Sequence, residues 1–352
     1  MSYLKEVKSK FLNLRNKKDV VILAIESSCD ETAVAIVKNG REVLANEVSS
    51  QIDIHRQFGG VVPEVASRNH VLAISNLYEK ALEKAGLSAS DIDLIAVTYG
   101  AGLMGALLVG VNFAKGLAYS LNLPLVAVSH IDGHIAANYI SHKTLQPPFL
   151  CLMVSGGHTA ILKISDYNKH KLLGTSVDDA VGECFDKVAR VLGLCYPGGP
   201  EIDKLAKTGK NNIKFIVSNS LQKSLNFSFS GIKTAVINHV HNKQQKHEEI
   251  RKEDIARSFQ ECVTDELCFK ALNALRISKI DKLVIAGGVG ANSMLREKLD
   301  KLCKKEQFEV FYPELKYCTD NAAMIASAAY FYLKDKKGLA TLSLTASPNV
   351  DL

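Results

Sequence analysis

Two histidines stand four residues apart in the segment His130-Ile-Asp-Gly-His134. On a helix this spacing puts both imidazoles on one face, within reach of a single cation. The segment differs from the zinc-peptidase motif H-E-x-x-H, because Ile131 replaces the glutamate that would activate water, so peptide hydrolysis lacks its base. A third ligand must come from elsewhere, and Asp320, which opens an alanine-rich helix, is the best candidate. Two alternatives remain: the histidines are surface or capping residues, and Asp320 is an ordinary N-cap.

Three polar turns could hold a phosphate, since each follows an apolar, strand-like run: residues 26–32, 155–159 and 287–292. Glycine lets backbone N–H groups approach an anion, and serine or threonine adds a hydroxyl donor. Turn geometry alone favours the same residue types, but three such turns in one chain favour nucleotide binding. The chain has no Walker motif and no G-x-G-x-x-G before a helix, which disfavours a P-loop NTPase and a Rossmann dehydrogenase.

Arginine and histidine gather around the start of the first long helical pattern. Arg56, Arg68 and His70 could contact phosphate, although Glu64 and Ser67 in the same stretch are equally suited to helix capping. Both interpretations remain open.

The stretch Asn226-Phe-Ser-Phe-Ser-Gly-Ile-Lys233 interleaves aromatic rings, hydroxyls and a lysine. This combination is compatible with stacking on nucleic-acid bases. Phenylalanine at alternate positions is more often simply core.

The elements that must position these residues repeat in two halves of the chain. Each half begins with three strand-like runs that form an antiparallel meander, and helical patterns alternating with buried strands follow. The expected strands lie at 20–25, 33–37, 41–48, 94–98 and 125–128 in the first half, and at 150–154, 159–164, 167–174, 282–286 and 309–312 in the second. Two such units predict a duplicated α/β domain with a cleft between the copies.

Composition indicates a folded globular chain, because 47% of its 352 residues are apolar and 23% are charged. The net charge is +6, and residues 1–20 supply most of it, with six basic and two acidic side chains. Because the rest of the chain is close to neutral, contact with nucleic acid requires a local basic patch, this tail or a partner protein.

Eight cysteines form no C-x-x-C pair, which is typical of reduced, buried thiols in an intracellular protein. Residues 1–19 lack the apolar stretch of a secretory signal. The longest uncharged run, 94–114, is interrupted by glycines, so we expect no membrane contact. These features predict a cytoplasmic protein, or a mitochondrial one if residues 1–19 are a transit peptide.

Together the motifs resemble one family along nearly the whole chain, from about residue 20 to about residue 333. They are Ala24-Ile-Glu-Ser-Ser-Cys-Asp-Glu-Thr32, Gly59-Gly-Val-Val-Pro-Glu-Val-Ala-Ser-Arg68, His130-Ile-Asp-Gly-His134, Val154-Ser-Gly-Gly-His-Thr159, Phe185-Asp-Lys187, Pro197-Gly-Gly-Pro200, Phe227-Ser-Phe-Ser-Gly-Ile-Lys233 and Gly287-Gly-Val-Gly-Ala-Asn292. In this order they resemble the tRNA N6-adenosine threonylcarbamoyltransferases, in their bacterial and mitochondrial branch.

The resemblance implies an actin-like fold, shared with sugar kinases, in which two duplicated ribonuclease-H-like lobes enclose a nucleotide. We expect lobe I at 20–130 plus 320–345, lobe II at 131–319, and a basic tail at 1–19. The implied reaction moves the L-threonylcarbamoyl group of threonylcarbamoyl-AMP to N6 of adenosine 37 in tRNAs that read codons beginning with A, and AMP leaves.

The resemblance also implies the roles of individual residues. His130, His134 and Asp320 would coordinate one divalent metal ion per subunit, iron(II) first and zinc as the alternative. Asp30 and Glu31 are candidates for the general base, and the choice between them stays open. The residues expected to contact the adenylate are Met153, Val154, Ser155, Gly156, Gly157, Asp186, Gly199, Asp203 and Asn292.

Expected partners are tRNA, a catalytically silent paralogue and a P-loop ATPase subunit. Two other functions use the same phosphate turns. One is an ATP-dependent phosphotransferase of the sugar-kinase type, and the other is a non-catalytic scaffold that switches with nucleotide. The intact set of His130, His134 and Asp320 argues against the scaffold.

Overall fold

The computed structural model describes residues 3–215, 221 and 223–350. The chain divides into two compact units: unit 1 contains residues 1–146 and 313–352, and unit 2 contains residues 147–312. The expected lobe boundaries, at 130/131 and 319/320, differ from these. The reason is that helix α5 (His130–Ser141) packs against helix α11 (Ala322–Lys334) inside unit 1.

Unit 1 is built on a six-stranded sheet in the order β11-β5-β4-β1-β2-β3. Its strands are β1 (Val21–Glu26), β2 (Glu31–Lys38), β3 (Glu42–Ser50), β4 (Leu94–Gly100), β5 (Leu125–Ser129) and β11 (Leu339–Ala340). Strands β1, β2 and β3 form an antiparallel meander, while β4 and β5 continue parallel to β1. The predicted meander is confirmed, and its three strands are set by runs of β-branched and small apolar residues.

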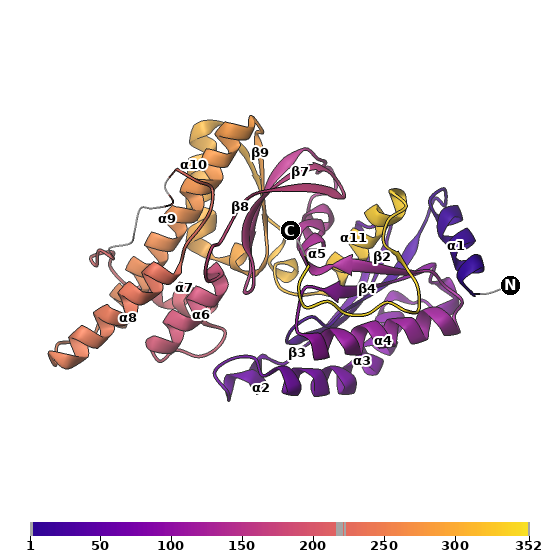
Figure 1. Cartoon of the computed structure of the whole chain (residues 1–352), viewed down its shortest axis with the longest axis horizontal. Helices are drawn as coiled ribbons and strands as arrows, with labels where there is room; N and C mark the ends of the chain where they lie inside the picture. The colour runs from indigo at the N-terminus through magenta and orange to yellow at the C-terminus, as the bar shows by residue number, and fades with distance from the viewer. Residues whose placement is uncertain (1–2, 216–220, 222, 351–352) are drawn as a thin grey trace. The chain divides into compact units, whose positions relative to one another are not determined.

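Helices cover both faces of this sheet (Figure 1). Helices α3 (Pro63–Ala85) and α4 (Met104–Ser120) pack on the face that carries Leu23 and Ile25. Helix α11 packs along β1 and β2, and its run of alanines lets its backbone approach the sheet closely. The remaining helices of unit 1 are α1 (Tyr3–Leu14), α2 (Ile52–Arg56) and α5, with short 3₁₀ turns at Ala89–Asp91 and Leu315–Tyr317.

Residues 1–19 were expected to be a basic tail, but the described part of this segment belongs to the fold of unit 1. Residues 3–14 form α1, which buries Val7 and Phe11. The guanidinium of Arg15 donates to the carbonyl of Lys334, and the hydroxyl of Tyr3 donates to the carbonyl of Leu123. This charged segment folds because burial of an apolar side chain such as Val7 or Phe11 stabilises the folded state by about 1.5–3 kcal/mol.

Unit 2 repeats the connectivity of unit 1. Its sheet has the order β10-β9-β6-β7-β8, with strands β6 (Phe149–Val154), β7 (Thr159–Asp166), β8 (Lys169–Thr175), β9 (Lys282–Ala286) and β10 (Glu309–Phe311). Strands β6, β7 and β8 form the antiparallel meander, and β9 and β10 run parallel to β6. Strand β6 is therefore the counterpart of β1, and the predicted duplication is confirmed at the level of topology.

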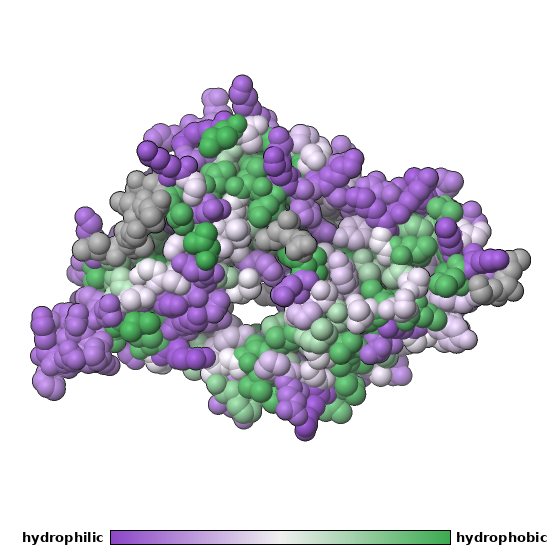
Figure 2. Space-filling model, viewed as in Figure 1, coloured by the Kyte–Doolittle hydropathy of each residue, from purple (hydrophilic) through white to green (hydrophobic). Residues whose placement is uncertain are grey.

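One face of the second sheet carries a large helical core. The helices are α6 (Val181–Val191), α7 (Gly198–Ala206), α8 (Ser230–Gln245), α9 (Lys252–Ser278) and α10 (Ser293–Glu306), with a 3₁₀ turn at Gly288–Ala291. Phe227 and Phe229 are fully buried in this core, so the core interpretation of their motif is right and base stacking is wrong. The polar connection between α8 and α9 is exposed, and hydrophilic side chains cover the free end of α8 (Figure 2).

The eight cysteines are free thiols, and five of them are buried: Cys151, Cys184, Cys268, Cys303 and Cys318. The expectation of buried thiols holds for these five, whereas Cys195 is exposed. Within the described ranges, no helix combines the length and the apolar character needed to cross a bilayer.

Candidate functional site

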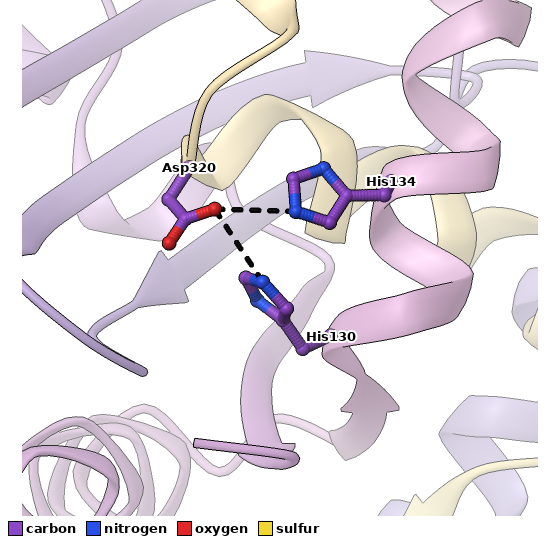
Figure 3. Close-up of side chains that lie close together, drawn as sticks. All are labelled: His130, His134 and Asp320. Carbon is purple, nitrogen blue, oxygen red and sulfur yellow. Dashed lines mark ion pairs between the residues drawn. The ribbon is translucent and has the colours of Figure 1, made fainter. Parts of the chain in front are cut away.

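His130, His134 and Asp320 converge in unit 1 (Figure 3). Strand β5 ends at Ser129, and α5 starts with His130, so both imidazoles project from the first turns of α5. Nε2 of His134 lies 3.2 Å from Oδ1 of Asp320, and Nε2 of His130 lies 3.4 Å from the same oxygen. The two histidine side chains are only 11% and 3% exposed, which rules out the interpretation as surface residues.

The glycine between the two histidines lets α11 reach the site. A Cβ atom on Gly133 would lie 2.6 Å from Cδ1 of Ile325, so a larger residue there would have to displace side chains of α11. Asp320 is not the N-cap of α11, because Asn321 takes that role by accepting a hydrogen bond from the N–H of Met324. The carboxylate of Asp320 is therefore available to the histidines.

The donor set fits a metal ion. Ligands bound at about 2.0–2.1 Å around a tetrahedral ion lie about 3.3 Å from one another. The separations of 3.2 and 3.4 Å between Asp320 and the two Nε2 atoms match that value, and one donor atom from each residue lies within 4.8 Å of the others. Two imidazoles and a carboxylate suit zinc, iron(II) and related ions.

A further carboxylate supports His130 from behind. Oε2 of Glu26, at the end of β1, lies 3.2 Å from Nδ1 of His130, and Oγ of Ser28 lies 3.1 Å from the same nitrogen. Glu26 is fully buried and accepts a hydrogen bond from the hydroxyl of Thr98 on β4. Sequence reasoning did not assign Glu26, although its place as a charged residue at the end of an apolar strand was a signal.

Electrostatics in this cluster favour a positive charge. Burial alone would raise the pKa of Asp320, but the charges and hydrogen bonds of His130 and His134 hold it well below its usual value. Burial alone would lower the pKa of His130, yet the carboxylates of Asp320 and Glu26 raise it well above its usual value. A bound cation would replace the proton that this cluster holds.

The candidate base residues are adjacent: Asp30 ends the turn between β1 and β2, and Glu31 is the first residue of β2. Asp30 is buried, and the hydroxyl of Ser50 donates to Oε1 of Glu31 at 3.1 Å. Burial, and then the negative charges of Asp320 and Asp30, raise the pKa of Glu31 to about 9. A cation at the histidine cluster opposes this shift, because it offsets the charge of Asp320.

Of the three residues considered for phosphate contact, the two arginines form exposed ion pairs and the histidine is buried. Arg56 pairs with Asp53, and Arg68 pairs with Glu64. His70 is buried on α3, where Nδ1 lies 2.7 Å from the hydroxyl of Thr32 and Nε2 lies 2.9 Å from the carbonyl of Cys29.

The turn between β6 and β7 contains two glycines with open space around them. Ser155 is buried at its start, and its N–H donates to the carbonyl of His158. A Cβ atom on Gly156 or Gly157 would meet no described atom within 4 Å. The space beside the backbone at these two glycines is therefore empty of described atoms. Helix α6 starts beside this turn: a Cβ on Gly182 would lie 2.7 Å from the carbonyl oxygen of Ser155. The N–H groups of Val181 and Gly182 at the start of α6 donate to the hydroxyl of Thr159 and to the carbonyl of Ser155, so α6 contributes the positive end of its dipole to this turn.

A second predicted turn meets the first. Gly287, after β9, has φ +94°, and a Cβ atom there would lie 2.5 Å from the carbonyl oxygen of Val154. Turns 155–159 and 287–292 are thus neighbours in unit 2. Turn 26–32 occupies the equivalent position after β1 in unit 1, as β1 is the counterpart of β6.

The other expected adenylate contacts surround α7. Oδ1 of Asp186 accepts the N–H of Gly198 at the start of that helix, and Gly199 follows in its first turn. Asp203, one turn further, is linked to Asn292 through Gln260 of α9. Sequence reasoning missed Gln260, although a glutamine in an otherwise apolar stripe of α9 was a signal.

Solved structures share this fold. Full-length HypF in its phosphate- and nucleotide-bound form aligns with a TM-score of 0.61 at 16% identity, covering 93% of this chain and 47% of that one. Component A of (R)-2-hydroxyglutaryl-CoA dehydratase from Acidaminococcus fermentans aligns with a TM-score of 0.54 at 14% identity, covering 90% of this chain and 98% of that one. These likenesses and the duplicated topology place the chain in the class of actin-like ATPase-fold proteins, as the sequence predicted.

Sequence comparisons narrow this class to one family. The family model of tRNA N6-adenosine threonylcarbamoyltransferase matches residues 42–327. A protein of that name from Clostridium perfringens strain SM101 is 57% identical over 338 residues, covering 96% of this chain and 99% of the relative. One from Clostridium botulinum strain Hall is 54% identical with the same coverage. The chain belongs to the tRNA N6-adenosine threonylcarbamoyltransferase family.

Proposed function

We propose that this chain transfers the L-threonylcarbamoyl group of threonylcarbamoyl-AMP to N6 of adenosine 37 in tRNAs that read codons beginning with A. As a member of its family, the chain is an acyltransferase that modifies tRNA. The observation that carries the proposal is the convergence of two Nε2 atoms, from His130 and His134, on one oxygen of Asp320. A sugar-kinase activity has only the fold in its favour.

The reaction forms one C–N bond and breaks one C–O bond. The N6 amine attacks the carbamoyl carbon, AMP leaves with the bonding electron pair on its phosphate oxygen, and the amine loses a proton. An aromatic amine is a weak nucleophile, so positioning and charge stabilisation supply most of the rate. A divalent ion held by His130, His134 and Asp320 supplies, when bound, positive charge for the acyl and phosphate oxygens.

The proton of the amine goes to a carboxylate in turn 26–32, either Asp30 or Glu31. Glu31 can accept it only in the ionised state. Since its pKa lies at about 9 while the histidine cluster is free of metal, a base role for Glu31 requires the cation beside Asp320. His70 supports both candidates, because it holds Cys29 and Thr32 on either side of them.

The adenylate lies, in this proposal, on unit 2. The backbone of residues 153–157 and the start of α6 receive its phosphate, since open glycines and a helix N-terminus suit an anion. The carboxylates of Asp186 and Asp203 receive hydroxyls of the ribose, because each can accept two hydrogen bonds. Gly199 and Asn292 complete the expected contacts to the nucleoside.

We infer that the ion is iron(II), with zinc as the second choice, because both suit the donor set and the family resemblance favours iron. A catalytically silent paralogue and a P-loop ATPase complete the proposed assembly on tRNA. The relatives named above are bacterial, which favours the cytoplasm over a mitochondrion as the site of action.

The test is a reconstitution. The purified chain is incubated with unmodified tRNA, threonine, bicarbonate, ATP, the adenylate-forming enzyme, iron(II) and the partner proteins, and the digested tRNA is analysed by mass spectrometry. We expect N6-threonylcarbamoyladenosine. Absence of this nucleoside with all components present would refute the proposed reaction.

A further inference from the structure

The carboxylate of Glu26 lies behind His130, on the side of the ring away from Asp320. Its Oε2 is 3.2 Å from Nδ1 of His130, while Nε2 of the same ring is 3.4 Å from Oδ1 of Asp320. The imidazole therefore lies between two carboxylates, one at each nitrogen. Glu26 is not among the three residues that can hold the ion.

Glu26 is held rigidly. The N–H of Ser28 donates to Oε1 at 2.5 Å, and the hydroxyl of Thr98 donates to Oε2 at 2.5 Å. Thr98 lies on β4, which pairs with β1 in parallel, so the sheet itself fixes the carboxylate. Glu26 has no solvent exposure, and burial of a charge in this way is costly unless every oxygen has a partner.

The carboxylate determines the tautomer of His130. An ionised carboxylate can only accept hydrogen bonds, so Nδ1 must keep its proton when the ion displaces the proton of Nε2, and the lone pair of Nε2 is then directed to the ion beside Asp320. This is the state that a metal-binding imidazole needs. Carboxylate partners of this kind orient metal-binding histidines and increase their basicity.

We infer that Glu26 is a positioning residue of the metal centre: it fixes the ring orientation of His130 and keeps a proton on Nδ1, so that Nε2 is the nitrogen that binds the ion. This inference rests on the metal site of the proposed function. The inference concerns metal binding and not acyl transfer. A failed acyl-transfer assay would therefore refute the proposed reaction without refuting the role of Glu26.

A competing acceptor provides the matched control. Oγ of Ser28 lies 3.1 Å from the same Nδ1, but it is a neutral hydroxyl. Hydrogen bonds to an ionised acceptor are about twice as strong as those between neutral groups. Glu26 should therefore matter more than Ser28 for the affinity of the site.

The experiment measures Zn²⁺ binding alone, by competition with a chelating dye. We expect Glu26→Gln to weaken Zn²⁺ binding about 10–100-fold, as loss of such a partner does elsewhere, and Ser28→Ala to weaken it less than about threefold. Thermal unfolding of the metal-free variants checks that both fold. If Glu26→Gln binds Zn²⁺ as the unaltered chain does, or if Ser28→Ala costs as much, the inference is wrong.

A second measurement needs no variant. In the ¹⁵N-histidine NMR spectrum of the Zn²⁺-loaded chain, the ring of His130 should show a protonated Nδ1 in a strong hydrogen bond and a Nε2 bound to metal. A metal-bound or unprotonated Nδ1 would overturn the inference even if Glu26→Gln failed to fold.

Discussion

The side-chain amide of Gln260 donates a hydrogen bond to Oδ1 of Asp203 at 3.0 Å. The carbonyl oxygen of the same amide accepts a hydrogen bond from Asn292 at 3.0 Å, and Gln260 is 1% exposed. The oxygen of Asn292 is itself engaged, because it accepts the N–H of Leu295 and caps α10. One buried glutamine of α9 thus orients two of the residues proposed to contact the adenylate.

Replacing Gln260 should weaken nucleotide binding. Gln260→Leu removes a donor from Asp203 and leaves Asn292 without its acceptor, at a cost of about 1–3 kcal/mol per unsatisfied buried group. We expect the Kd of AMP, measured by calorimetry, to rise about tenfold, which corresponds to about 1.4 kcal/mol. The matched control is Gln245→Leu, at the exposed end of α8, which should leave the Kd unchanged.

The ligand provides a second control for this prediction. If Gln260 acts by aiming Asp203 at ribose hydroxyls, 2′,3′-dideoxy-AMP should lose much less affinity than AMP in the Gln260→Leu variant. Equal losses for the two nucleotides would contradict an orienting role at the ribose.

Binding of the ion should stabilise unit 1. A ligand present at 100 times its Kd raises the free energy of unfolding by about 2.7 kcal/mol. We expect Zn²⁺ to raise the urea midpoint of the unaltered chain. The midpoint of His134→Ala should not change, because this variant lacks one of the three ligands. His142→Ala, at the other end of α5, should respond like the unaltered chain. An undiminished shift in His134→Ala would mean that the ion binds elsewhere.

Glu31 should make the metal-free chain less stable as the pH rises. Its pKa is raised in the folded state from 4.5 to about 9, so its neutral form is favoured by folding. The sign follows from linkage: between pH 4.5 and about 9 the unfolded state has lost the proton and the folded state keeps it, so each rise in pH favours unfolding. Between pH 4.5 and about 9, the free energy of unfolding of Glu31→Gln should therefore fall less steeply with pH than that of the unaltered chain.

The exposed residue Glu42 supplies the matched variant for this pH series. Glu42→Gln should follow the unaltered chain throughout the range. Parallel curves for Glu31→Gln and the unaltered chain would show that Glu31 is ionised without difficulty in the folded protein.

The contact between two turns of unit 2 should not tolerate a methyl group. In Gly287→Ala the new Cβ would lie 2.5 Å from the carbonyl oxygen of Val154, in a backbone conformation with φ +94° that alanine adopts with strain. We expect a loss of more than about 1 kcal/mol in urea unfolding. Gly288→Ala, whose Cβ meets no described atom within 4 Å, should cost much less. Equal losses for the two variants would contradict this geometry.

Sequence patterns anticipated the fold well, because the hairpin of β1 and β2 and its counterpart of β6 and β7 depend on local apolar runs and turn residues. Sequence patterns predicted the structure less well where it depends on contacts between segments that are distant in the chain. The extent of unit 1 depends on the packing of α5 against α11, and the folding of residues 3–14 depends on two apolar side chains in a charged segment.

The same contrast holds for the site. The spacing of His130 and His134 indicated a metal site directly, and the structure brings Asp320 to them. The local sequence marks Glu26 and Gln260 as unusual polar residues, but it does not identify their partners, which lie 104 and 32 positions away in the chain. The roles of Arg68 and His70 were ambiguous for the same reason.

The central claim is that acyl transfer to tRNA depends on an ion held by His130, His134 and Asp320. The most direct test strips the chain of metal, reloads it with iron(II), and quantifies N6-threonylcarbamoyladenosine for the unaltered chain, for Asp320→Asn and for the exposed control Asp335→Asn. The account predicts that reloading restores product in the unaltered chain and the control but not in Asp320→Asn. Full product from Asp320→Asn, or from the stripped chain, would contradict it.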